Sequence, residues 1–535
     1  MASAHEAMLS SSSRTRLVSV GDPERRSLEP LSFVLGLTVE QQTTGSVDVS
    51  RPDLRGVLVF LDDGNHAKIH SEIVRLIDRN IFEYGALLVV VAPNPALAQF
   101  ARAQAIDALP KRKNPRIIKG SLPEFGAVSL FSDGDVASTQ REKLFLDAIT
   151  RFLRQNPPET PADGGLNITI DDEGHFWTQD EILLRRAFRG FTHLHLTKEL
   201  GGRSKDCAVW RVEAQKGAHN LEPFIAKAAV RDELTYEYDT YRDMVRDHVS
   251  FPFRAPLLDG CFVRGASRAL LVSAFVTRAQ RFDEFLMHTS TPELVVASVF
   301  QNALSNWRRH AQLNTNISVG DRYVQAQEEA LRANASASAI YAPSPLLPDP
   351  QNLATAYADC KKHRFRASPP SVLWTALRHV PKASHYISGM HGDLNIRNIF
   401  VRWHSSDSIL IDFSNSGDKD FLSRDPAKME TSIALLCKGN GKPILSEKYF
   451  RGLYRPPLLP LRDLYIGDGR VEAIRQIRKQ ARGEGIDDPE YALVVACHLL
   501  RFSQNAPGAQ VDRELDRRRA LSYSLACVLI ERYKG

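Results

Sequence analysis

The 535-residue sequence lacks cysteine pairs at metal-binding spacing, and it lacks any apolar run of membrane-spanning length. Its six cysteines are scattered without a CxxC or CxxH pair, which argues against a zinc site or a disulfide framework and is typical of reduced thiols. The longest apolar runs, at 86–92 and 492–497, fall well short of the about 20 residues that a transmembrane helix needs. We therefore expect a cytoplasmic protein with no membrane partner.

Strong charge is also lacking. The formal net charge of +6 is mild for this length, and the densest basic cluster, KRKNPR at 111–116, is typical of a solvated loop. Nothing in this pattern indicates a nucleic-acid partner. Residues 1–50 contain no apolar core of signal-peptide length, and apart from a strand-like run at 31–39 we expect them to form a largely irregular leader.

Residues 51–155 show buried strands alternating with amphipathic helices. RGVLVFLDDG (55–64) and ALLVVVAPN (86–94) read as buried strands, and the segments at 67–80 and 95–109 have helical spacing of apolar residues. This alternation predicts a parallel sheet covered on both faces, which is a small three-layer α/β domain. The Pro/Gly-rich segment NPPETPADGG (156–165) then marks a domain boundary.

Beyond residue 165 the pattern changes to that of an antiparallel sheet followed by helices. Five runs predict antiparallel strands, at 192–200, 207–215, 223–230, 257–264 and 268–276. Helical patterns dominate after residue 280, interrupted by a Ser/Ala/Pro-rich segment at 334–350 that we expect to be an exposed loop. Two further helices are predicted in the tail, 487–535.

The stretch YISGMHGDLNIRNIFV (386–401) sets polar residues tightly between apolar flanks. It reduces to His391-x-Asp393-x4-Asn398, and a short strand then delivers Asp412 in SILIDFSNSG (408–417). Surface loops are rich in Asp and Asn, so such a string can arise by chance. The apolar flanks and the following strand instead favour a set of oxygen ligands suited to Mg²⁺, with Asp393 left to accept a hydroxyl proton.

These residues resemble the catalytic loop and metal-binding strand of the aminoglycoside phosphotransferase/choline kinase group, which are protein-kinase-like phosphotransferases. The resemblance implies that Asp393 is the catalytic base and that Asn398 and Asp412 hold Mg²⁺. It implies that His391 braces the loop. Ser414 stands where a protein kinase has Gly, a departure that this group commonly shows.

The same resemblance implies a phosphate loop in LGGRSKDCAV (200–209). Gly201 and Gly202 would let the backbone approach the β- and γ-phosphates, and Ser204 would donate a hydrogen bond to them. Lys205 and Asp206 are bulkier than the family's usual residues at this point. Taken alone, the Gly-Gly pair would indicate no more than a hairpin turn.

Lys227 in the strand FIAKAAV and the helix that follows it resemble the family's lysine–glutamate pair, with Lys227 on the α- and β-phosphates. Glu233 and Glu237 lie on one helical face, and we prefer Glu237 as the partner. The alternative is an edge-strand lysine that reaches solvent. Backbone groups at Ala274 and Val276 would meet the adenine edge, at a hinge between the two lobes.

Downstream, the resemblance implies that Asp425 caps the backbone of the catalytic loop from the start of a helix, a role compatible with an ordinary N-cap. The expected fold of this part is bilobal α+β, with an antiparallel β N-lobe at 165–276 and a helical C-lobe with insertions at 277–535. Asn395 and Arg397 occupy variable positions of the motif, where we expect acceptor preference to show.

Asp62 and Asp63 follow the first buried strand of the α/β domain, which resembles a receiver-like (flavodoxin-like) domain, with a regulatory role. Such acids bind metal or accept phosphate there, or they simply begin a turn. Because the next strand ends without an acidic residue, an interaction module that binds a protein partner is the preferred interpretation. By analogy of fold, the domain combination implies a bacterial signalling or conflict system.

The sequence therefore predicts an ATP- and Mg²⁺-dependent phosphotransferase that carries the γ-phosphoryl group to a hydroxyl of a small molecule or a protein. The alternative is a catalytically inactive pseudokinase that senses nucleotide and acts as a scaffold. No motif identifies the acceptor or the oligomeric state.

Overall fold

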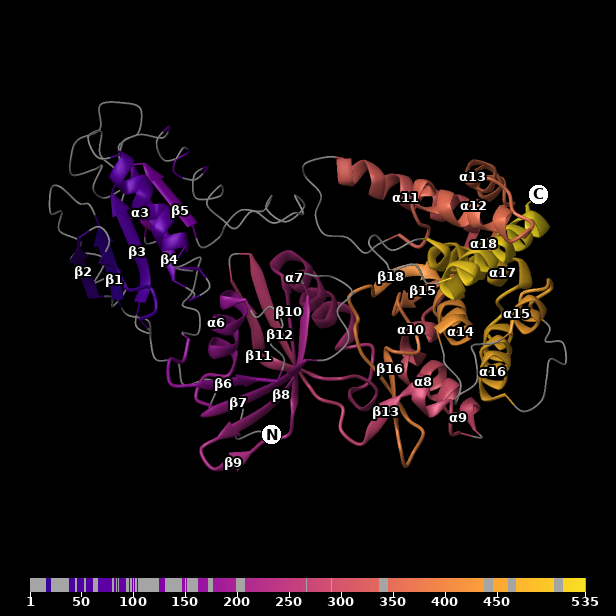
Figure 1. The fold of residues 1–535 in the computed structure, drawn as a ribbon, viewed down its shortest axis with the longest axis horizontal. Coiled ribbons are helices and arrows are strands. Elements are labelled where there is room, and N and C mark those ends of the chain that lie inside the picture. The colour runs from indigo at the N-terminus through magenta and orange to yellow at the C-terminus, as the bar shows by residue number, and fades with distance from the viewer. Residues whose placement is uncertain are drawn as a thin grey trace. The chain divides into compact units, whose positions relative to one another are not determined.

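The structure is a computed structural model (Figure 1). The residues it describes are 16–20, 38–43, 46–51, 54–60, 66–78, 81–82, 84, 86–92, 96, 99, 101, 103, 125–129, 147–149, 151, 162–171, 177–198, 207–265, 267–289, 291–335, 345–436, 446–459, 468–504 and 513–534. The chain divides into two compact units, each described separately. The first comprises Met1–Thr235 and Pro256–Phe275, and the second comprises Tyr236–Ala255 and Val276–Gly535.

The first unit begins with a five-stranded, all-parallel sheet. Its strands have the order β2-β1-β3-β4-β5, which is the flavodoxin-like order of doubly wound folds. They are β1 (Arg16–Val20), β2 (Thr38–Gln42), β3 (Leu54–Phe60), β4 (Leu87–Ala92) and β5 (Phe125–Ser129). Every residue of β3 and β4 is buried, as the apolar runs predicted. Helix α3 (His66–Asp78) buries Ile73, Leu76 and Ile77 in the same core.

The sheet starts before the predicted boundary at residue 51. Strand β1 and most of β2 come from the segment that we expected to be an irregular leader, so that expectation is wrong for 16–20 and 40–42, whereas β2 begins within the strand-like run at 31–39. Both strands have only five residues, and β2 is a largely polar strand at the edge of the sheet. Asp62 and Asp63 lie outside the described residues, and the receiver-like interpretation stays a prediction.

A second, seven-stranded sheet follows in the same unit, antiparallel except where β6 runs parallel to β7. Its order is β11-β12-β10-β8-β7-β6, with β9 paired to β8. The strands are β6 (Asn167–Ile170), β7 (His193–Lys198), β8 (Ala208–Lys216), β9 (His219–Asn220), β10 (Phe224–Val230), β11 (Leu257–Arg264) and β12 (Arg268–Ala274). All five predicted strands are present.

Helix α6 (Thr178–Ala187) packs on one face of this sheet. It is fastened there by an ion pair between Asp180 of α6 and Arg268 of β12, and both side chains are fully buried. Ala226 and Ala228 of β10 belong to the apolar core on this face. Because side chains alternate along a strand, Lys227 lies on the opposite face of the sheet.

The second unit contains two small antiparallel sheets that frame the polar stretch. One has the order β13-β16-β17 and the other the order β14-β15-β18. Their strands are β13 (Ala279–Arg281), β14 (Gln312–Ile317), β15 (Ala383–Met390), β16 (Ile399–Arg402), β17 (Ser408–Leu410) and β18 (Gly417–Phe421). Since β15 ends at Met390 and β16 begins at Ile399, the polar loop links the two sheets.

Helices make up most of the second unit. They are α8 (Phe282–Phe285), α9 (Pro292–Ala297), α10 (Ser305–Arg309), α11 (Val319–Ala335), α12 (Ala354–Lys362), α13 (Pro370–Arg378), α14 (Arg424–Leu436), α15 (Glu447–Leu453), α16 (Gly469–Gly483), α17 (Asp488–Ser503) and α18 (Arg513–Tyr533). Short 3₁₀ or π turns occur at Tyr241–Val245, Phe251–Phe253, Ser298–Ala303 and Pro350–Leu353. Helix α7 (Arg231–Thr240) spans the boundary between the units.

The core of the second unit is organised around α17, which lies beside α18 (Figure 1). The polar centre of this core is an ion pair between Glu430 of α14 and Arg478 of α16, and Tyr491 of α17 donates a hydrogen bond to Glu430 (2.7 Å). The two tail helices predicted from the sequence are therefore confirmed as core elements. Among the described helices, none combines the length and the apolar character needed to cross a bilayer.

Candidate active site

The loop between β15 and β16 is fixed through its backbone. The carboxylate of Asp425, in the first turn of α14, accepts hydrogen bonds from the backbone N–H groups of His391 (2.8 Å) and Gly392 (3.0 Å). The capping role predicted for Asp425 is confirmed. Gly392 adopts a left-handed conformation (φ 77°), and a Cβ there would lie 2.0 Å from the carbonyl oxygen of Asn415. Only glycine suits this position, because both conformation and space exclude a side chain.

His391 braces the loop, as predicted. Its side chain is fully buried, and Nε2 donates a hydrogen bond to the carbonyl oxygen of Ile411 (3.0 Å). The imidazole also packs against the ring of Phe413, with the ring centroids 4.8 Å apart. His391 therefore ties the polar loop to the strand that leads to Asp412.

Asp393 is held by three polar side chains. Asn395 Nδ2 donates to its Oδ2 (3.0 Å), Asn398 Nδ2 donates to its backbone carbonyl oxygen (2.9 Å), and Lys428 Nζ lies 2.7 Å from its Oδ1. The side chain of Asp393 is about a quarter exposed, so a solute can reach the carboxylate. Asn395 is buried and serves to position Asp393, whereas Arg397 is exposed.

The role of Lys428 was not predicted from the sequence. Lys428 lies on α14, three residues after Asp425, so both side chains project from the same face of the helix toward the loop. The spacing Asp425-x-x-Lys428 was the available signal. Once Asp425 is assigned as the cap of the loop, a lysine at i+3 is brought to the same loop.

Asn398 and Asp412 fit the role of metal ligands. Asn398 is tethered by its Nδ2 group, and among the described residues its Oδ1 takes part in no hydrogen bond. Asp412 has a left-handed backbone (φ 59°), which is rare outside glycine, and its Oδ1 accepts a hydrogen bond from Ser414 (2.9 Å). The Ile411 N–H donates to the Asn398 carbonyl (3.0 Å), which brings the two segments together. Amide and carboxylate oxygens at this point are the hard ligands that Mg²⁺ prefers.

Residues 236–255 support the site from within the second unit. The ring of Tyr241 meets that of Phe413 edge-on, with the centroids 6.2 Å apart, and the guanidinium of Arg254 lies over Tyr241. The Ala255 N–H donates to the carbonyl oxygen of Leu410 (3.2 Å). The strand that leads to Asp412 is thus held by a segment more than 150 residues earlier in the chain.

The predicted nucleotide-binding residues between 201 and 237 are only partly described. Gly201, Gly202 and Ser204 lie outside the described residues. Lys227 lies in β10, where its backbone is paired with Val209 of β8 and Leu271 of β12. Glu237 lies on α7 and is buried. The pairing of Lys227 with Glu237 stays a prediction.

The predicted hinge coincides with the boundary between the units, which falls between Phe275 and Val276. The Ala274 N–H donates to the carbonyl oxygen of Pro256 (3.0 Å), and the Phe275 N–H donates to that of Pro223 (3.1 Å). Neither amide is available to a ligand. Among the described residues, the Val276 N–H makes no hydrogen bond, so Val276 is the better candidate donor for an adenine edge.

No protein-family model matches the chain, and no curated protein matches it. Solved structures that match the chain include an ethanolamine kinase from Plasmodium vivax, with 12% identity, a TM-score of 0.34, and coverage of 76% of this chain and 99% of that one. Another is an aminoglycoside-3'-phosphotransferase of type VIII, with 14% identity, a TM-score of 0.30, and coverage of 62% and 93%.

An aminoglycoside phosphotransferase from Streptomyces rimosus, solved with ADP and streptomycin, has 16% identity, a TM-score of 0.27, and coverage of 60% and 90%.

Proposed function

We propose that the chain transfers the γ-phosphoryl group of ATP to a hydroxyl group of an acceptor. The observation that supports this best is the way the loop is fixed. Asn398 donates a side-chain hydrogen bond to the backbone carbonyl of Asp393, and its own backbone carbonyl accepts a hydrogen bond from the N–H of Ile411, the residue before Asp412. A reachable carboxylate beside two oxygen ligands is the arrangement that phosphoryl transfer to an alcohol requires.

Asp393 takes the role of general base. Its Oδ1 is engaged by Lys428 and its Oδ2 by Asn395, so the carboxylate has a fixed orientation before substrate arrives. The acceptor hydroxyl gives its proton to Asp393 while the hydroxyl oxygen attacks the γ-phosphorus of ATP. The bond between the γ-phosphorus and the β,γ-bridging oxygen then breaks, and ADP leaves with that oxygen. Lys428 is placed to attract a phosphoryl oxygen, which would position the phosphate against Asp393.

Asn398 and Asp412 would hold Mg²⁺, which when bound neutralises charge on the β- and γ-phosphates. Lys227 is assigned to the α- and β-phosphates, with Glu237 as its partner, and Gly201, Gly202 and Ser204 to the phosphate loop. Val276 is assigned to the adenine edge. The N-terminal parallel sheet is assigned a regulatory role through a protein partner, and the cytoplasm is the expected location.

Purified protein tests this proposal with two matched variants, Asp393→Asn and Asp412→Asn. Mg·ATP should raise the melting temperature of the wild-type protein in a thermal-shift assay. The wild-type protein should also consume ATP and transfer the phosphoryl group to water, to its own chain or to an acceptor in a small-molecule extract. Asp393→Asn should keep the thermal shift and lose transfer, because the base is gone while the ligands stay. Asp412→Asn should lose both.

The alternative is a nucleotide-sensing pseudokinase that acts as a scaffold. It predicts a Mg·ATP shift that depends on Asp412 with no transfer to any acceptor, in wild type as in Asp393→Asn. Absence of any shift with Mg·ATP in wild type would overturn both the enzyme and the scaffold.

A further inference from the structure

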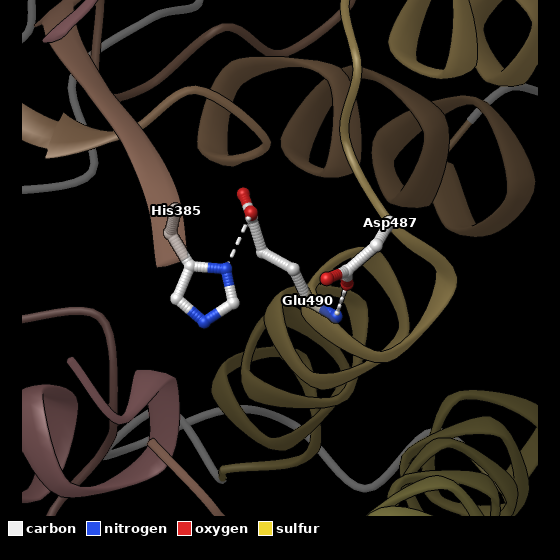
Figure 2. A group of neighbouring side chains, drawn as sticks. All are labelled: His385, Asp487 and Glu490. Carbon is white, nitrogen blue, oxygen red and sulfur yellow. Dashed lines mark hydrogen bonds and ion pairs between the residues drawn. The ribbon is translucent and has the colours of Figure 1, made fainter. Parts of the chain in front are cut away.

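A second group of potential metal ligands lies away from the proposed phosphotransfer residues. His385 belongs to β15, Glu490 to the first turn of α17, and Asp487 is the N-cap residue of that helix (Figure 2). One ligand atom from each side chain lies within 4.8 Å of the other two. Asp487 is exposed, whereas His385 and Glu490 are 4% and 3% exposed. The group therefore has a buried end and an end that faces solvent.

The carboxylate of Glu490 is only half satisfied. Its Oε2 lies 2.9 Å from His385 Nδ1, but its Oε1 is buried and has no hydrogen-bond partner among the described residues. Leaving a buried polar atom unpaired costs about 1–3 kcal/mol, and more if the group is charged. Oε1 belongs to the same carboxyl group as Oε2, the oxygen that Figure 2 shows joined to the ring nitrogen of His385. A bound cation would satisfy it.

Asp487 is already oriented for the same role. Its Oδ1 accepts a hydrogen bond from the Glu490 N–H (2.7 Å), which fixes the carboxylate at the start of α17. Among the described residues, its Oδ2 makes no hydrogen bond. The start of a helix repels a cation through the helix dipole. Here Asp487, Asp488 and Glu490 bring three carboxylates to that turn, and they outweigh the partial positive charge of the helix end.

We propose that His385, Glu490 and Asp487 bind one divalent cation of the zinc or manganese type. One imidazole nitrogen with two carboxylates suits these cations, whereas Mg²⁺ favours oxygen ligands alone. Ligands at about 2.0–2.2 Å from a tetrahedral zinc lie roughly 3.4 Å from one another, so the 2.9 Å between His385 Nδ1 and Glu490 Oε2 would open by about half an ångström when the cation binds. The exposed Asp487 carboxylate supplies the third ligand, and water fills the remaining positions.

The position of this site suggests what the cation does. Strand β15 carries His385 near its start and ends at Met390, directly before His391 and the loop that holds Asp393. A cation between His385 and Glu490 would fasten β15 to α17. This proposal does not depend on phosphoryl transfer, because it concerns different residues and a different cation.

The alternative is a buried hydrogen bond between His385 and Glu490 that binds no metal. Full-length protein freed of metal with a chelator separates the two. We expect Zn²⁺ or Mn²⁺ to raise the melting temperature and to bind at one equivalent per chain by elemental analysis after gel filtration, whereas Mg²⁺ at the same concentration has no such effect. No shift and no retained metal in wild type would overturn the proposal.

Two variants remove ligands while keeping the hydrogen bonds of the cluster. Glu490→Gln can still bond to His385, and Asp487→Asn is still a good N-cap residue. Each should weaken cation binding by at least about tenfold, since even supporting residues around a metal contribute that much. Asp487 is exposed, so Asp487→Asn stays informative if Glu490→Gln fails to fold. Unchanged binding in Asp487→Asn would contradict the proposal.

The chain offers a matched control in His195 and Asp171, an exposed histidine–carboxylate pair at 3.1 Å. Asp171→Asn should leave zinc or manganese binding unchanged. If it weakens binding as much as Asp487→Asn, the cation is held elsewhere and the proposed site is wrong. Asp412→Asn should lose the Mg·ATP shift while keeping the zinc or manganese shift, so failure of one proposal can be told from failure of the other.

Discussion

The ammonium group of Lys428 lies 2.7 Å from Oδ1 of Asp393, and the two side chains come from elements that are 35 residues apart in the chain. Asp393 sits in the loop after β15, and Lys428 sits in the first half of α14. Both side chains are about a quarter exposed, so this ion pair is open to a substrate rather than sealed in the core. In the proposed reaction, Lys428 would both orient Asp393 as the base and lie within reach of the group on which Asp393 acts.

Substituting Lys428→Met should lower the rate of phosphoryl transfer by about ten- to a hundredfold, because it removes one oriented charge from the site. Mg·ATP should still stabilise the protein, because the ligands Asn398 and Asp412 are untouched. Lys428→Arg keeps the charge and should retain more of the rate. Steady-state kinetics measures the transfer rate, and a thermal-shift assay measures the binding of Mg·ATP. Equal transfer rates in Lys428→Met and wild type would show that Lys428 has no role in transfer.

Substituting Asp425→Ala should destabilise the second unit by about 2–6 kcal/mol. The two N–H groups of His391 and Gly392 would lose their acceptor in a buried position, and each unpaired group costs about 1–3 kcal/mol. Urea unfolding gives the free energy. Asp425→Asn keeps one acceptor oxygen and should fall between wild type and Asp425→Ala. If both variants lose the same free energy of unfolding, Asp425 caps the loop through its charge and not through its two hydrogen bonds.

In the first unit, Asp180→Ala should lower the free energy of unfolding by about 3–5 kcal/mol, because it leaves Arg268 as a buried charge without its ion-pair partner Asp180. The double substitution Asp180→Leu with Arg268→Met removes both charges and should recover most of that loss. Denaturant unfolding of the three proteins tests this. A double variant as unstable as Asp180→Ala would show that packing, and not the unpaired charge, dominates.

His498 should make the second unit less stable in mild acid. Burial holds the pKa of His498 well below its usual value of 6.5, and the nearby charges of Lys428 and Arg424 lower it further. The folded form therefore keeps His498 neutral while the unfolded chain takes up a proton below pH 6.5. Its contribution to stability is present above pH 6.5 and is lost as the pH falls, by about 1.4 kcal/mol between pH 7.5 and 5.5.

Measuring the free energy of unfolding at pH 7.5 and 5.5 in wild type and His498→Gln tests this assignment. Gln can still donate to the carbonyl oxygen of Arg424, the partner of His498 Nε2 at 3.3 Å, but it does not titrate. The free energy of unfolding should differ less between pH 7.5 and pH 5.5 in the variant than in wild type. The same difference in both proteins would assign the effect to another group.

Local patterns in the sequence predicted much of the fold. The apolar runs of β3 and β4 are buried throughout, and the alternating runs at 192–276 form the expected strands. The loop at 391–398 was predicted with its cap, because Asp425 follows the motif at a recognisable distance. Strand β1 was missed because it is only five residues long and has polar flanks, and β2 because most of it is polar and it lies at the edge of the sheet.

The pairs that depend on packing between distant segments could not be predicted. His385 and Glu490 are 105 residues apart, and a histidine in a strand beside a helix carries no signal of its own. The contact of Lys428 with Asp393 likewise needs α14 to be placed against the loop. Residue type and spacing identified the loop. Only the packing of α14 showed that Lys428 lies beside Asp393, and only the packing of α17 showed that Glu490 lies beside His385.

The division of the chain into units has a practical consequence for truncation. The second unit is built from Val276–Gly535 together with Tyr236–Ala255, which comes earlier in the chain. An expression fragment that starts at the hinge would lack Tyr241 and Arg254, and the ring of Phe413 would keep its contact with His391 but lose its contact with Tyr241. The helical half therefore cannot be isolated by a single cut at residue 276. A fragment that begins before Tyr236 necessarily carries β11 and β12 with it.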